Sequence, residues 1–172
     1  MILIMFIADE LRLKKEDQTF DRKSIRIEPK ALAMSITAFA NADGGTIAIG
    51  ITDDGQIEGI NGYTQKINEI LRVPFDFCKP TVKVDFEYVD CVDRDGNPNK
   101  IFLLNVFQSK TVHSNQGDDV FYRVGDKSKK LTFDERLQLM YDKGDMLYEN
   151  TFIKGTKIED LDMILVNRKR LM

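Results

Sequence analysis

The chain has 172 residues, of which 42% are hydrophobic and 31% charged, with a formal net charge of -3. This length is typical of one domain, and the hydrophobic content is sufficient for a real core. The net charge excludes a polycation that attracts nucleic acid through its total charge, so any such binding must come from local basic patches. The cysteines, Cys78 and Cys91, stand alone, and His113 is the single histidine. This pattern argues against a zinc site and favours a reduced protein.

The first eight residues, MILIMFIA, are apolar. The run is too short to span a bilayer, and positive charges follow it, whereas in a signal peptide they precede it. We therefore predict no membrane association and, without targeting signals, a cytoplasmic protein. Met1–Leu13 is predicted to form a short helix, with residues 1–10 as a docking segment.

After a charged break, Thr19–Ile27 is predicted to be extended. Pro29 then starts a helix, because proline suits the first turn. Apolar residues at helical spacing, Leu32, Ile36 and Phe39, mark its buried stripe.

The stretch 38–62 reads AFANADGGTIAIGITDDGQIEGING. It predicts the end of a helix and a tight turn, followed by a buried strand at Thr46–Thr52. A hairpin turn at 53–55 and a short strand through Ile60 are predicted next. Its glycines predict close approach of the backbone to a ligand or to another chain segment. They are Gly44, Gly45, Gly50, Gly55 and Gly59.

Further along, Gln65–Val73 is predicted to be a helix that Pro74 ends, followed by a linker at 75–80. Thr81–Val92 alternates and predicts a half-buried strand with Val82, Val84, Phe86, Tyr88 and Val92 on one face. The nearly continuous apolar run Lys100–Phe107 predicts a central strand, antiparallel to it across the loop 93–99.

The remainder predicts a loop at 108–118, a strand at Val120–Val124 and a basic turn at 125–130. Thr132 is expected to cap a helix that runs to about Asp142, with Glu135 completing a capping box and Gly144 ending it. Leu137, Met140 and Tyr141 are expected on its buried side. Residues 145–172 are predicted to be a linker and a last helix.

Nucleotide-binding glycine motifs and a Ser/His/Asp triad are excluded. The glycines fail both the P-loop and the G-x-G-x-x-G spacings. No G-x-S-x-G elbow accompanies His113, which is expected to be exposed in a polar loop.

Carboxylates provide one candidate site. Glu16 and Asp21 flank the start of a predicted strand, and Asp53 and Asp54 follow the next one. If these strand ends are neighbours, the carboxylates converge and could hold Mg²⁺ or Mn²⁺ for phosphodiester hydrolysis. The alternative is that the aspartates form a simple turn and that Glu16 is a solvated charge.

Two basic segments, Arg22–Lys30 and Gln108–Lys130, provide another candidate site. Basic residues with nearby aromatics suit phosphate contact and base stacking. In so short a strand either Phe121 or Tyr122 must face the core, so at most one aromatic is free. The alternative is a solvated charged surface. The predicted nucleic-acid-binding residues are Arg22, Lys23, Tyr122, Arg123, Lys127, Lys129 and Lys130.

The run KEDQTFDRKSIRIEPKALAMSITAFANADGGTIAIGITDDGQIEGI resembles the opening of the AlbA_2, or Schlafen AlbA_2-like, domain, and VFYRVGDKSKKLT resembles its second hallmark. The resemblance covers about residues 11–144. It implies an α+β domain with a mixed, mainly antiparallel sheet packed with helices. It also implies nucleic-acid binding, most simply DNA binding, as in transcriptional regulators, where an ATPase-like or winged-helix region often follows. We expect a homodimer and no cofactor.

In the Schlafen branch this domain is an endoribonuclease whose acidic triad has the spacing of Glu16 and Asp21, with Asp53 as the third member. The resemblance therefore implies, as an alternative function, a nuclease that uses these three residues with Mg²⁺ or Mn²⁺. Asp21 departs from the longer acid usual there, and the Schlafen zinc-binding residues have no counterpart. A third alternative is a protein-interaction or dimerisation domain.

Overall fold

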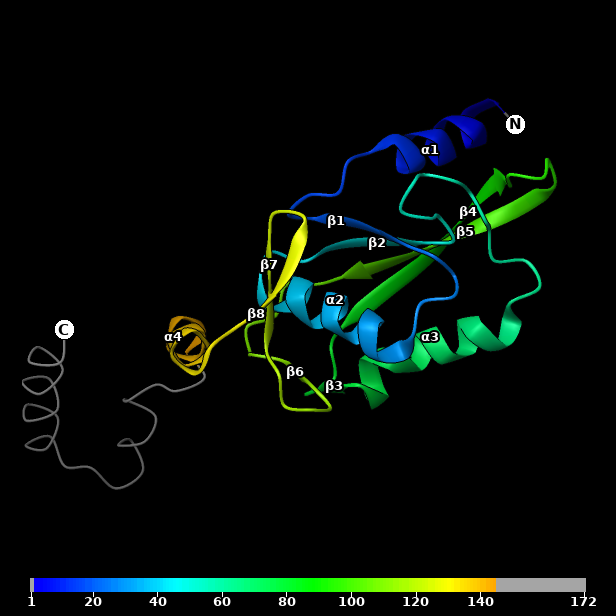
Figure 1. The fold of residues 1–172 in the computed structure, drawn as a ribbon. Helices are drawn as coiled ribbons and strands as arrows, with labels where there is room; N and C mark the ends of the chain where they lie inside the picture. Colours follow the sequence, from blue (N-terminus) through cyan, green and yellow to red (C-terminus); the bar gives the residue numbers. More distant parts are fainter. Residues whose placement is uncertain (1, 145–172) are drawn as a thin grey trace, which may run out of the picture.

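A computed structural model describes residues 2–144 (Figure 1). Its central sheet has four strands in the order β1 (Phe20–Lys23), β2 (Gly45–Ile49), β5 (Pro98–Val106) and β4 (Val84–Val92). The β1–β2 pair is parallel, and the other two pairs are antiparallel. The predicted α+β class with a mixed, mainly antiparallel sheet is confirmed.

Helices cover both faces of this sheet (Figure 1). Helix α1 (Ile2–Leu13) lies on one face, while α2 (Pro29–Asn41) and α3 (Thr64–Asp76) lie on the other. Because side chains alternate along a strand, Ile47 and Ile49 of β2 pack into the larger core with α2 and α3. Ala48, between them, packs into the smaller core on the α1 face. The position of a residue along β2 therefore decides which of the two cores its side chain enters.

The glycine-rich stretch 38–62 is approached by other parts of the chain. A Cβ on Gly45 would lie 2.6 Å from the carbonyl oxygen of Thr19, and one on Gly59 would lie 2.0 Å from the side chain of Asn99. Gly59 also has a φ of 72°, which few other residues adopt. At these two positions the close approach is therefore internal packing. Beyond β2, the predicted short strand is reduced to one bridge between Ile51 and Ile57.

Several segments differ from those predicted. Helix α3 continues through Pro74 to Asp76, because Val73 and Pro74 are buried and pack the last turn against the core. The predicted linker and the loop at 108–118 each contain a two-residue strand, β3 (Cys78–Lys79) and β6 (Ser114–Asn115), which pair with each other. The predicted basic turn is mostly a strand, β8 (Lys127–Lys130), paired with β7 (Phe121–Val124).

Strand β4 is less buried than its alternation predicts. Phe86 and Tyr88 are each 48% exposed, although both rings contact Phe102. The reason is that β4 lies at the edge of the sheet, where only one side of the strand has a neighbour.

Helix α4 (Phe133–Lys143) begins and ends as predicted. Thr132 and Glu135 form the capping box, and Gly144 adopts a left-handed conformation at the other end. None of its residues is buried among the described part of the chain, so the predicted buried side is wrong. The helix lies apart from the sheet in Figure 1, which leaves it no core to face. The prediction for residues 145–172 lies outside the described residues.

The lone histidine and both cysteines are buried. His113 was predicted to be exposed, but its backbone N–H donates to Asn41 and its ring contacts Ser109 and the carbonyl of Pro80. Burial raises the pKa of Cys78 to about 12 and is the main cause that raises the pKa of Cys91 to about 11. Both thiols are therefore protonated and poorly reactive near neutral pH.

Within residues 2–144, no helix combines the length and the apolar character that crossing a bilayer requires.

Candidate functional site

A cavity of about 390 Å³ lies between β1, α2 and the β7–β8 hairpin. We call it the β1 pocket. Its walls include the three carboxylates of the predicted triad and three of the predicted basic residues. These six residues are Glu16, Asp21, Asp53, Lys23, Arg123 and Lys127.

The sheet explains why these groups meet. Asp21 and Lys23 are two apart on β1, so both face the α2 side of the sheet. Glu16 precedes β1, and its carboxylate accepts a hydrogen bond from the Arg22 N–H at 3.2 Å. Asp53 follows β2, which runs parallel to β1 and therefore ends at the same edge.

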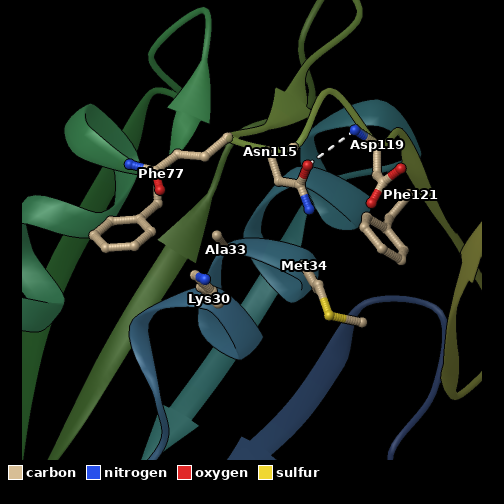
Figure 2. Close-up of a pocket in the computed structure, with 9 residues that line it drawn as sticks. Lys30, Ala33, Met34, Phe77, Asn115, Asp119 and Phe121 are labelled. Carbon is tan, nitrogen blue, oxygen red and sulfur yellow. Dashed lines mark hydrogen bonds between the residues drawn. The ribbon is translucent and has the colours of Figure 1, made fainter.

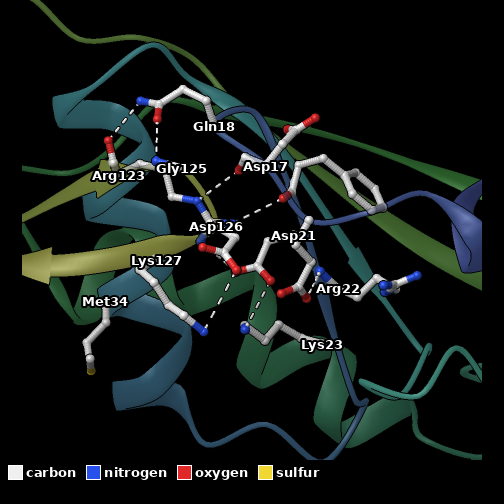
Figure 3. A network of polar contacts seen from close by, with 12 residues as sticks. Asp17, Gln18, Asp21, Arg22, Lys23, Met34, Arg123, Gly125, Asp126 and Lys127 are labelled. Atoms are coloured by element: carbon white, nitrogen blue, oxygen red, sulfur yellow. Dashed lines mark hydrogen bonds and ion pairs between the residues drawn. The ribbon is translucent and has the colours of Figure 1, made fainter.

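Asp21 forms a buried ion pair with Arg123 on β7 (Figure 3). The Arg123 Nη1 lies 3.2 Å from Asp21 Oδ2, and the residues are each 1% exposed. Arg123 also donates to the carbonyls of Asp17 and Phe20, both at 3.1 Å, and its guanidinium lies 4.8 Å from the ring centre of Phe39. Each of the three guanidinium nitrogens thus makes a hydrogen bond that holds β7 against β1.

Gln18 makes a second connection between the same segments (Figure 3). Its amide nitrogen donates to the Arg123 carbonyl at 2.8 Å, and its amide oxygen accepts from the Gly125 N–H at 2.7 Å. The hairpin turn is therefore fixed relative to the start of β1, and so is the position of Lys127 just beyond it.

Glu16 has a perturbed titration. Burial, a hydrogen bond with Asp21 and the negative charge of Asp21 raise the pKa of Glu16 above its ordinary 4.5, in that order of importance. Lys23 and the Arg22 N–H act in the opposite direction. Glu16 therefore holds its proton to a higher pH than an isolated glutamate does.

This raised pKa predicts a pH-dependent stability. Between pH 4.5 and the raised value, the folded protein holds more protons on Glu16 than the unfolded chain does. The contribution of Glu16 to the free energy of unfolding is thus complete below pH 4.5, and it is lost as the pH rises through the pKa of Glu16 in the folded protein. Glu16→Gln should remove this part of the pH dependence in urea unfolding, whereas Glu87→Gln, on the edge strand β4, should keep it. A Glu16→Gln effect that is constant with pH would contradict the assignment.

The carboxylates do not form a metal site as they stand. Among residues 2–144, no group of three or more Asp, Glu, His or Cys side chains is arranged to hold a metal ion. Two cations lie beside Asp21: Oδ2 accepts from Arg123, and Oδ1 lies 3.1 Å from Lys23 Nζ, although Oδ1 accepts no hydrogen bond in the described part of the chain. A divalent ion would have to displace that lysine, so the predicted Mg²⁺ or Mn²⁺ does not fit this arrangement.

The predicted basic residues separate into three groups. Arg123 is buried and committed to Asp21, so direct phosphate contact does not fit it. Arg22 faces the opposite side of the sheet, where it donates to the carbonyl of Arg12. The remaining lysines, Lys23, Lys127, Lys129 and Lys130, lie in the pocket wall or on β8.

The chain matches the family model described as "Schlafen, AlbA_2" over residues 16–132. The chain belongs to this family. Among solved structures, it is similar to the DIP2311 protein from Corynebacterium diphtheriae, with 20% identity and a TM-score of 0.49. That match covers 73% of this chain and 27% of the other, so the chain spans about a quarter of that protein's length. No curated protein matches the chain.

Three residues of this Schlafen, AlbA_2 domain were missed as site residues. Gln18 fixes the hairpin, Met34 lines the β1 pocket, and Asn41 of the AFAN motif binds the loop that precedes β7. Asn41 is the last residue of α2. The helix spacing from Leu32 and Ile36 could not reveal its partners, which are more than 70 residues away.

Proposed function

We propose that this domain binds nucleic acid, with the outer face of the β7–β8 hairpin as its principal surface. The observation that carries the proposal is the hairpin register. Tyr122 pairs with Lys129 and Val124 pairs with Lys127, so these four side chains share one face. Lys127 and Lys129 are 81% and 51% exposed. Lysines beside an accessible aromatic suit phosphate contact and stacking of a base.

The existing ion pairs of these lysines do not oppose the proposal. Lys129 pairs with Glu135 and Lys130 with Asp119, and all four side chains are partly exposed. Exposed pairs contribute only about 0–1 kcal/mol, so a phosphate can compete for the lysine. Inside the β1 pocket, Asp21 forms ion pairs with Arg123 and Lys23. It therefore repels an approaching phosphate less than an unpaired carboxylate would.

The Lys127→Gln/Lys129→Gln double variant tests this surface. We expect it to weaken binding of a fluorescent single-stranded oligonucleotide about tenfold, since each lysine lost removes a phosphate contact. Fluorescence anisotropy at low salt measures the effect. Lys100→Gln is the matched control, because Lys100 is also an exposed strand lysine paired with an aspartate, Asp90. Equal losses in both variants would contradict a role of the hairpin.

A nuclease is the second candidate, because Glu16, Asp21 and Asp53 line one pocket. The ion pairs of Asp21 favour binding without cleavage. We therefore expect incubation of RNA and DNA with Mg²⁺ or Mn²⁺ to give no cleavage that depends on Asp53. Cleavage by the wild type that disappears in Asp53→Asn would instead favour the nuclease.

A further inference from the structure

A second cavity, of about 490 Å³, lies beside α2 (Figure 2). Met34 lines both cavities. The second cavity is formed by α2, by the residue that follows α3 and by the segment from β6 to β7. Its lining comprises Lys30, Ala33, Met34, Phe77, Asn115, Gln116, Gly117, Asp119 and Phe121.

Asn115 provides an oriented hydrogen-bond donor in this cavity. Its Oδ1 accepts from the Asp119 N–H at 2.9 Å, which fixes the orientation of the amide. The remaining group, Nδ2, donates to no residue in the described part of the chain, and Figure 2 shows it directed away from Asp119. The backbone of Asn115 is held by pairing with Cys78 in the β3–β6 ladder.

The other walls suit a flat, unsaturated ring. Phe77 and Phe121 lie on opposite sides of the cavity, and the α2 residues Ala33 and Met34 lie below Asn115 (Figure 2). A cavity of this volume falls within the range of small-molecule sites, which combine apolar walls with a few placed polar groups. Lys30, exposed in the first turn of α2, adds a cation at the same cavity.

The cavity also lies beside a lysine of the β7–β8 hairpin. Asp119, which lines it, forms an ion pair with Lys130 of β8 at 3.0 Å. Lys130 pairs with Phe121 and therefore lies on the opposite face of the hairpin from Lys127 and Lys129. A phosphate bound by Lys130 would lie close to the cavity. A base that is free of a pairing partner can turn into it, whereas a base in a duplex cannot without being unpaired.

We propose that this cavity binds one unpaired nucleobase of a single-stranded nucleic acid, with Asn115 Nδ2 donating to a ring nitrogen or carbonyl oxygen of the base and Lys30 contacting the adjacent phosphate. This inference rests on the proposed function and deepens it, because it assigns single strands as the substrate class.

The test compares two oligonucleotides of equal length, one with bases and one in which the central positions are abasic. Because both carry the same phosphates, the ratio of their dissociation constants isolates the contribution of the bases. We expect the wild type to prefer the strand with bases about tenfold, the scale of one base that is both stacked and hydrogen-bonded. Asn115→Asp keeps the Oδ1 acceptor for Asp119 but removes the donor, and it should lower this ratio several-fold, because a carboxylate opposes an acceptor atom of the base. Thermal unfolding checks that this variant folds, and Lys30→Gln, at an exposed position, should weaken binding of both strands.

The outcomes separate the two proposals. Equal binding of both strands by the wild type would overturn the base site and leave the proposed function intact. Binding of neither strand would overturn the proposed function as well. A preference that is unchanged in a folded Asn115→Asp variant would overturn the role of Asn115. A free nucleoside monophosphate that competes as strongly as the strand would assign the cavity to a free nucleotide and overturn the inference.

Discussion

Replacing Arg123 with Ala is expected to lower the free energy of unfolding by about 3–5 kcal/mol, the usual cost of removing one partner of a buried ion pair. The substitution leaves the buried carboxylate of Asp21 without its buried cationic partner and removes the donors that Arg123 supplies to the carbonyls of Asp17 and Phe20. Within the described part of the chain, the Phe20 carbonyl then accepts only from the Asp17 N–H. It also removes the contact with the Phe39 ring. Chemical denaturation with urea measures the change.

Two further variants separate the charge from the packing. Arg123→Met retains volume but not the charge, and combining it with Asp21→Asn removes both charges together. Because an unpaired buried charge is the costly species, the double variant is expected to be more stable than Arg123→Met alone. Additive losses from the two single changes would contradict a coupled pair.

Replacing Asn41 with Ala is expected to lower the free energy of unfolding by about 3 kcal/mol or more, since three buried backbone groups lose their hydrogen bonds. The Asn41 amide donates to the carbonyls of His113 and Phe121, at 2.9 and 2.8 Å, and accepts from the His113 N–H at 2.8 Å. The loop that leads into β7 would therefore loosen from α2. Urea unfolding measures the loss of stability, and hydrogen exchange should show faster exchange at residues 113–121.

Asn61→Ala is the matched control for this prediction. The Asn61 amide makes one exposed hydrogen bond, to the carbonyl of Pro98 at 3.1 Å. Loss of this hydrogen bond should lower the free energy of unfolding by at most about 1 kcal/mol, because water can replace an exposed partner. Similar losses for Asn41→Ala and Asn61→Ala would mean that Asn41 does not hold the loop.

Much of the framework could be predicted from local patterns. The start of α2 at Pro29 and the capping box of Thr132 and Glu135 depend on residues within a few positions of each other, so the sequence reveals them directly. The convergence of Glu16, Asp21 and Asp53 was predicted on the condition that the two strand ends are neighbours. The pairing of β1 with β2, together with the hydrogen bond that brings Glu16 back to Arg22, meets this condition.

Arg123 was predicted to contact nucleic acid, and the structure buries it; the sequence contained a signal for this burial. Because Phe121 faces the core, strict alternation along β7 places Arg123 on the same inner side. The same alternation separates Arg22 from Asp21 on β1. The burial of His113 could not be anticipated in this way, because its partner Asn41 lies 72 residues earlier on another element.

Membership of the Schlafen, AlbA_2 family fixes the fold of the chain more firmly than its chemistry, because one fold can host unrelated activities. Here the buried ion pair of Asp21 with Arg123 holds the β7–β8 hairpin against β1.

The salt dependence of binding tests this account most directly. Anisotropy titrations of a single-stranded oligonucleotide at a series of salt concentrations give the slope of log association constant against log salt. If about three or four lysines contact phosphates, the slope should be about -2 to -3, and it should become shallower in the Lys127→Gln/Lys129→Gln variant. Binding that does not change with salt, or no binding at low salt, would contradict the account.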